Sequence, residues 1–168
     1  MVRSFTASLL LVALLAQAVP GQEPAKSSPT PEMIKKLQDD LTNVKLIGSF
    51  TIAGKEDQTP KPEEYTISSA LKLPDGDVWL IKARIKYGDK DATVPIPLEI
   101  KWAGDTPVIT LTNLEIPGLG TFSSRVVIYE GRYAGTWQHG KVGGHLFGKL
   151  EKATANDPAK TEPKPADK

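Results

Sequence analysis

The stretch from Gly131 to Leu150, GRYAGTWQHGKVGGHLFGKL, predicts two β-strands joined by a tight turn at His139-Gly140-Lys141. Apolar and polar residues alternate on both sides of the turn, and a period of two is typical of strands with one buried face. The strands also contain Gly135, Gly143, Gly144 and Gly148. Glycine weakens a strand interior, so its repeated use indicates sharp bending or close backbone approach, as where a sheet curls into a small barrel.

Six further segments with a period of two precede this hairpin. They begin at Val44, Tyr65, Trp79, Val94, Val108 and Phe122. Short turns such as Pro74-Asp75-Gly76 separate them. Eight consecutive strands with short connections describe an antiparallel meander, and a meander of this size closes on itself and removes its edges. The predicted fold class is all-β, an eight-stranded antiparallel meander barrel.

A short amphipathic helix is predicted ahead of the barrel, over Pro31 to Thr42. Thr30 is placed to cap it and Pro31 occupies its first position. Leu37 and Leu41 belong to an apolar side with helical spacing. We expect this helix to plug or flank one end of the barrel.

Two prolines in the fourth strand predict a local weakness. Pro95 and Pro97 each lack the N–H group that a neighbouring strand would bond, and a central strand tolerates that loss poorly. The fourth strand should therefore contain a weakly paired or bulged stretch.

The ends of the chain differ in composition from its middle. Residues 1–18 have the parts of a secretory signal peptide: Arg3, an apolar run from Leu9 to Leu15, and Ala16-Gln17-Ala18 as the cleavage pattern. Residues 19–30 and 153–168 are polar and rich in proline, which predicts a flexible lead-in and a disordered tail around a barrel domain at 31–152. We expect a secreted or periplasmic protein cleaved near Ala18, with a retained N-terminal anchor as the alternative.

Charge and cysteine content exclude several classes of protein. The chain has 21 Lys and Arg against 20 Asp and Glu, and removal of Arg3 with the signal peptide leaves 20 of each. This balance gives no reason to expect a nucleic acid or an anionic membrane as partner. The absence of cysteine excludes disulfides, a thiol nucleophile and a thiolate metal site. We expect a monomer held together by its hydrophobic core.

The chain resembles the calycin-type barrels, the group of the lipocalins and avidins. The resemblance rests on Leu46-x-Gly48-x-Phe50 in the strand after the short helix and on Gly135-Thr136-Trp137 in the last hairpin. Phe50 stands where these barrels usually have tryptophan. The resemblance covers roughly residues 31–152 and implies that a ligand is held inside the barrel.

The predicted inward register gathers aromatic and hydroxyl side chains that could line a small-molecule site. The predicted ligand-binding residues are Tyr65, Ser69, Trp79, Trp102, Thr110, Thr112, Tyr133 and Trp137. A small apolar or amphipathic ligand would suit such a lining. The same residues would equally form the solid core of a filled barrel, so this alternative stays open.

Other interpretations of the sequence point to chemistry or to the outer surface. The two histidines, His139 and His145, could share one barrel end as a weak metal site, but they lack thiolate partners. The acid pair Glu63-Glu64 falls in a predicted connection, where solvation is the usual role. No serine has a nucleophile motif around it. We therefore expect a non-enzymatic protein without metal or cofactor, and the alternative function is interaction with an envelope or matrix component through basic residues of the outer face, Lys72, Lys82, Arg84 and Lys86.

Overall fold

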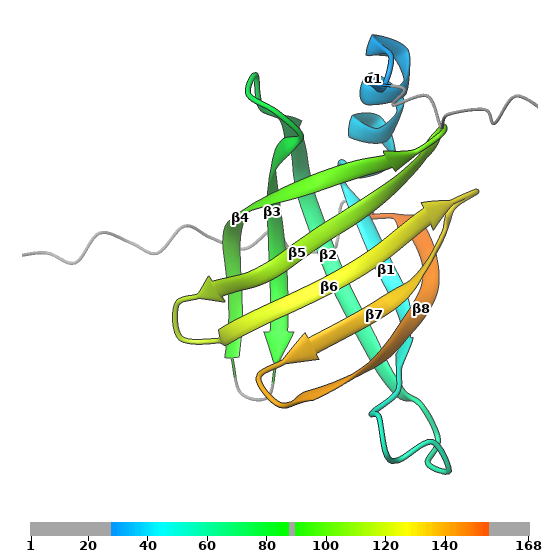
Figure 1. Ribbon diagram of the computed structural model, residues 1–168, viewed down its shortest axis with the longest axis vertical. Coiled ribbons are helices and arrows are strands. Elements are labelled where there is room, and N and C mark those ends of the chain that lie inside the picture. Colours follow the sequence, from blue (N-terminus) through cyan, green and yellow to red (C-terminus); the bar gives the residue numbers. More distant parts are fainter. Residues whose placement is uncertain (1–27, 88–89, 155–168) are drawn as a thin grey trace, which may run out of the picture.

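The computed structural model describes residues 28–87 and 90–154, which form one closed barrel of eight antiparallel strands with a helix at one end (Figure 1). The predicted all-β meander and its short helix are confirmed. The predicted signal peptide, most of the lead-in and nearly all of the tail lie outside the described residues. The elements are α1 (Pro31–Asp40), β1 (Val44–Phe50), β2 (Lys61–Lys72), β3 (Val78–Tyr87), β4 (Lys90–Ala103), β5 (Thr106–Ile116), β6 (Gly120–Tyr129), β7 (Arg132–His139) and β8 (Val142–Lys152).

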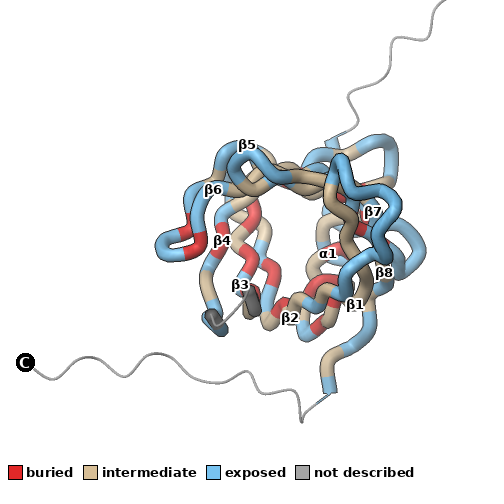
Figure 2. Tube along the Cα trace, turned by 90° about the horizontal axis from the view of Figure 1, so that it is seen from below, coloured by how far each residue is buried: buried red, intermediate tan, exposed pale blue. Residues whose placement is uncertain are grey.

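The helix α1 covers one end of the barrel. The Thr30 side chain accepts a hydrogen bond from the Met33 N–H at 3.3 Å, as expected of an N-cap. Leu37 and Leu41 are buried in the barrel core. Seen from the opposite end, α1 lies behind the ring of strands (Figure 2). The helix therefore plugs this end, which we call the helix end; the other is the turn end.

The barrel closes between its first and last strands. β1 pairs with β2 on one side and with β8 on the other, along all seven of its residues. In the β1–β8 ladder Gly48 lies opposite Gly148. The predicted role of the last hairpin, in which Gly144 and Gly148 let β8 bend and pair with the strand starting at Val44, agrees with this register.

The two prolines of β4 lie where that strand has one neighbour instead of two. β4 pairs with β3 from Lys90 to Glu99, but it pairs with β5 only from Glu99 to Ala103. Pro95 and Pro97 have the same parity along the strand, so their missing N–H groups face the same side. The prediction of a weakly paired stretch in β4 is confirmed on the β5 side.

Two irregularities shift the registers that a strict period of two predicts. In β2 the pairing with β3 shifts between Ile67 and Ser69, and as a result Ala70 is buried while Ser69 and Leu71 are exposed. In β5 the pairing with β6 shifts between Leu111 and Leu114, where Asn113 has a φ of 50°. A bulge adds one residue to one strand and reverses the sides of the residues that follow.

Candidate ligand-binding site inside the barrel

An apolar cavity of about 240 Å³ lies inside the barrel, and we call it the lumen. All eight strands contribute to its walls. Apolar side chains dominate the lining, among them Leu46, Ile67, Ile81, Ala83, Leu98 and Val126. At the turn end, the β5–β6 turn places Ile116 and Leu119 in the lining, and both side chains are buried. The barrel core is therefore incompletely filled.

Tyr133 reaches across the closing seam because two neighbouring residues are glycines. Its cross-strand partner on β8 is Gly148, and the partner of Gly148 on β1 is Gly48. A Cβ atom on Gly148 would lie 2.7 Å from Cε1 of Tyr133, and one on Gly48 would collide with the tyrosine hydroxyl. The Tyr133 side chain therefore lies over both glycines, and its hydroxyl reaches β2.

Trp137 lies four residues further along β7 and, like Tyr133, has a glycine as its cross-strand partner on β8. It lies opposite Gly144 of β8, and its Nε1–H donates a hydrogen bond to the Thr51 carbonyl oxygen at 3.1 Å. A Cβ atom on Gly144 would collide with that same carbonyl group. Phe50 packs edge-on against the Trp137 ring, with 5.5 Å between ring centroids. The spacing of four between Tyr133 and Trp137 matches the spacing of four between Gly148 and Gly144.

A carboxylate with two tyrosine partners lies at the wall of the lumen. The hydroxyl of Tyr133 donates to Oε1 of Glu63 at 2.9 Å, and the hydroxyl of Tyr65 donates to Oε2 at 3.1 Å. Both tyrosines line the lumen, whereas Glu63 is not itself one of the lining residues and is joined to the lumen through the two tyrosine hydroxyls. We call Glu63, Tyr65 and Tyr133 the Glu63 cluster.

Burial governs the acidity of the Glu63 cluster. Glu63 is partly buried, and this burial raises the pKa of its carboxyl group, although the hydrogen bonds from Tyr133 and Tyr65 act in the opposite direction. Burial and the nearby carboxylate also raise the pKa of Tyr65 and that of Tyr133, so both phenols keep their protons at neutral pH. Among the described residues, no basic side chain pairs with Glu63.

The structure brings three of the predicted site residues together at the lumen and places two elsewhere in the interior. Tyr65, Tyr133 and Trp137 belong to the lining. Trp79 is fully buried but lies outside that lining, and its indole N–H has no hydrogen-bond acceptor among the described residues. Trp102 lines a different pocket, next to α1.

The predicted inward register of three hydroxyl residues is wrong. Ser69 is exposed because the bulge in β2 reverses its side. Thr110 pairs with Arg125 on β6, and the exposed Thr112 accepts a hydrogen bond from that arginine at 2.8 Å, so both threonines belong to the outer face. Their neighbours Ile109 and Leu111 line the lumen instead. Burial of these larger apolar side chains is the more favourable choice of register.

Glu63 is the feature that the sequence interpretation missed. The strand β2 begins at Lys61, so Glu63 and Glu64 lie on opposite faces of a strand, whereas a solvated connection was predicted. Extending the period of two backwards from Tyr65 would have placed Glu63 inside. The glycine at position 48, which lies directly opposite Glu63 on β1, was a second signal.

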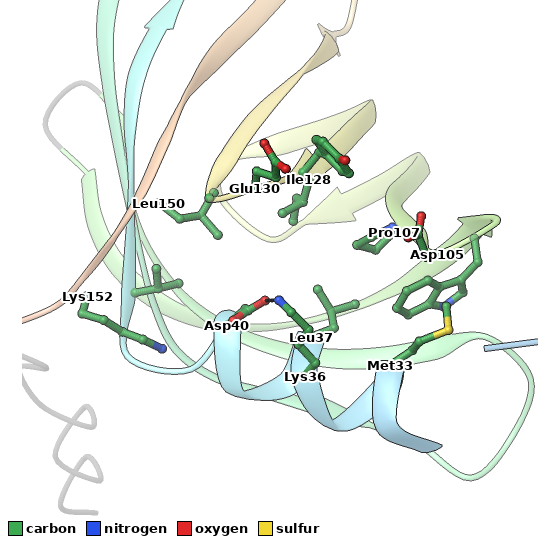
Figure 3. Close-up of a pocket in the computed structure, with 14 residues that line it drawn as sticks. Met33, Lys36, Leu37, Asp40, Asp105, Pro107, Ile128, Glu130, Leu150 and Lys152 are labelled. Atoms are coloured by element: carbon green, nitrogen blue, oxygen red, sulfur yellow. Dashed lines mark hydrogen bonds and ion pairs between the residues drawn. The ribbon is translucent and has the colours of Figure 1, made fainter. Parts of the chain in front are cut away.

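A second pocket, the helix groove, lies between α1 and the rim of the barrel and measures about 600 Å³ (Figure 3). Met33 and Leu37 of α1 lie on one side of it, with Pro107 and Ile128 on the other. Its rim is charged, and the Lys36 ammonium pairs with the Asp40 carboxylate at 2.5 Å. The groove is separate from the lumen because the two share no lining residue.

The structure separates the two histidines. His139 is on the inner side of β7 and stacks on Phe122, with ring centroids 4.4 Å apart. His145 is exposed on the outer side of β8. Within the described residues, no three His, Cys, Asp or Glu side chains gather as a metal site. On the outer face, Arg84 forms an ion pair with Asp91.

No protein-family model, no curated protein and no solved structure matches the chain. The likeness to calycin-type barrels therefore rests on architecture, an antiparallel eight-stranded barrel with a short helix before its first strand. As for membrane spans, the helical segment of the described residues lacks the length and apolar character that crossing a bilayer requires.

Proposed function

We propose that this protein is a non-enzymatic, calycin-type binding protein that holds a small apolar or amphipathic ligand in its lumen. The observation that carries the proposal is the apolar cavity of about 240 Å³ inside a closed barrel. Ligand sites of this kind combine apolar walls with a few polar groups, and here the Glu63 cluster supplies the polar groups. The predicted signal peptide supports a secreted or periplasmic location.

The size of the lumen limits the ligand. An apolar cavity of about 150 Å³ accommodates benzene, so a cavity of about 240 Å³ suits a molecule of roughly ten non-hydrogen atoms. Each buried methylene group contributes about 0.8 kcal/mol, which corresponds to about a fourfold gain in affinity. Affinity should therefore rise with chain length and stop rising once the lumen is full.

A titration with n-alcohols, from butanol to decanol, tests the proposal. Two-dimensional NMR of the labelled protein should show shifts at lumen-lining residues such as Ala83 and Val126. Ala83→Leu adds volume inside the lumen and should weaken octanol binding about tenfold or more. Ala134→Leu is the matched control because Ala134 lies exposed on the outer face, and it should bind octanol like the wild type.

Two results would contradict the proposal. The first is that no alcohol shifts any residue that lines the lumen. The second is that Ala83→Leu and Ala134→Leu bind octanol equally well, since binding would then occur away from the lumen. A filled core would produce both results.

A second candidate function, interaction of the outer face with an envelope or matrix component, is favoured by an exposed apolar row. Val127, Ala134 and Phe147 are cross-strand neighbours on β6, β7 and β8. Val127 and Phe147 remain 42% and 46% exposed. Co-sedimentation with isolated envelope material should weaken in Phe147→Ser if this row makes the contact, and should be unchanged if it does not.

A further inference from the structure

The Glu63 cluster determines which ligand head group the lumen would favour, and this inference rests on the proposed function. We infer that the lumen prefers a ligand whose polar end donates hydrogen bonds and carries positive charge, a primary amine, and that Glu63 receives this group. The apolar body of the ligand would extend along Leu46, Ile67 and Ile81, which line the same cavity.

The Glu63 cluster has more available hydrogen-bond acceptors than donors. Each tyrosine hydroxyl has one hydrogen, and both hydrogens are given to Glu63. The carboxylate retains further lone pairs, and so does each phenol oxygen. The cluster therefore offers acceptors to a ligand while its own donors are already used.

The negative charge of Glu63 also favours a cationic ligand. Glu63 is partly buried, and its two hydrogen-bond partners are neutral phenols. Removing a carboxylate from water is unfavourable unless a cation or several hydrogen bonds compensate. None of the described basic side chains supplies that cation. An alkylammonium ligand would supply it.

Three polar side chains of the lining direct a hydrogen-bond donor to a protein acceptor, and the Ser124 hydroxyl is a further polar group of the lining. Trp137 Nε1 donates to the Thr51 carbonyl, Ser123 Oγ to the Asn113 side chain, and Gln138 Nε2 to the Gly140 carbonyl. A ligand carboxylate entering the lumen would be repelled by the Glu63 carboxylate. The Glu63 cluster therefore discriminates against acids as well as favouring amines.

Calorimetric titration of the full chain with n-octylamine, n-octanol and octanoate at neutral pH tests the inference. The three probes share one chain length and differ in the head group. The wild type should bind the amine most tightly and the acid most weakly, with the two separated by about tenfold to a hundredfold in dissociation constant, as expected for hydrogen bonds to charged groups. This comparison needs no variant, so it does not depend on how a substitution affects folding.

Two glutamate variants locate the effect. Glu63→Gln should weaken octylamine binding about tenfold or more while leaving octanol binding nearly unchanged. Glu64→Gln is the matched control, because Glu64 is the next residue on the same strand, lies exposed on the outer face and pairs with Lys45. It should behave like the wild type with all three probes.

The outcomes separate this inference from the proposed function. Equal affinities for the three probes, tightest binding of octanoate, or an amine preference that survives in Glu63→Gln would overturn the inference, while octanol binding would still support a ligand in the lumen. If none of the three probes binds, the proposed function fails and the inference fails with it.

Discussion

Two opposite regions of the barrel wall are built differently. At the β8–β1 seam, β1 pairs along all seven residues, glycines face each other, and aromatic side chains from β7 lie across them. At the β4–β5 region only five residue pairs form, and prolines occupy the part of β4 that has no β5 partner. The tight seam fixes the Glu63 cluster in place, whereas the β4–β5 region has fewer paired residues beside lumen residues such as Ile96 and Leu98.

Glycines at the seam and prolines in β4 act differently on strand pairing. Glycines at the seam leave room for the Tyr133 side chain, because a Cβ atom on Gly48 or Gly148 would collide with it. Prolines in β4 prevent further pairing without disturbing the ladder with β3. Substitutions on the two sides should therefore have unequal effects on stability.

The largest effect is expected at the seam. Gly148→Ala places a Cβ atom against the Tyr133 ring and the Ile47 carbonyl, so we expect the free energy of unfolding to fall by about 3 kcal/mol, measured by urea denaturation. Ala134→Val is a control that adds volume on the exposed outer face of β7 and should change stability by less than about 0.5 kcal/mol. Equal losses in the two variants would contradict the account of the seam.

Removing one hydroxyl should have a smaller effect. Tyr133→Phe keeps the ring over the glycines but leaves one oxygen of the Glu63 carboxylate without its donor. We expect a loss of about 1–2 kcal/mol in the free energy of unfolding. Tyr129→Phe is the control, because Tyr129 is 58% exposed, and it should leave stability nearly unchanged.

The pH dependence of stability should report on Glu63. Its pKa in the folded protein lies above the ordinary value of 4.5, so the folded state binds this proton more tightly than the unfolded state does. The contribution of Glu63 to stability is therefore greatest below about pH 4.5 and declines as the pH rises through the raised pKa. Unfolding measured between about pH 4 and pH 7 should show a smaller decline for Glu63→Gln than for the wild type. Glu64→Gln should follow the wild type, and identical profiles for all three proteins would contradict this role of Glu63.

The smallest effect is expected at the prolines. Pro95→Val restores an N–H group where β4 has no β5 partner, so we expect a change in the free energy of unfolding of less than about 0.5 kcal/mol. Ile47→Pro, which puts a proline into the seam between β2 and β8, should destabilise by about 3 kcal/mol or more. Similar effects of the two substitutions would remove the distinction between the two regions.

The barrel was predictable because its signals are local. Alternation along β3, the turn residues between strands and the glycines of the last hairpin all act on neighbours in the chain. The N-cap at Thr30 and the weak stretch around Pro95 and Pro97 were predictable for the same reason, since each follows from one residue's backbone chemistry.

The site was only partly predictable because its geometry depends on registers. Tyr65, Tyr133 and Trp137 follow the simple alternation and line the lumen. Ser69 departs from this alternation because a bulge precedes it. The bulge arises from the pairing of β2 with β3, so the alternation of residues along the sequence does not reveal it. Glu63 accepts a hydrogen bond from Tyr133, which is 70 residues away in the sequence. The two residues meet only because the barrel closes and Tyr133 of β7 reaches across β8 and β1 to β2.

A crystal structure of the protein grown with n-octylamine tests the central claim most directly. We predict that the amine occupies the lumen, with its nitrogen within hydrogen-bond distance of the Glu63 carboxylate and its chain against Leu46 and Ile81. Amine bound in the helix groove beside Met33 and Trp102, with an empty lumen, would contradict the claim.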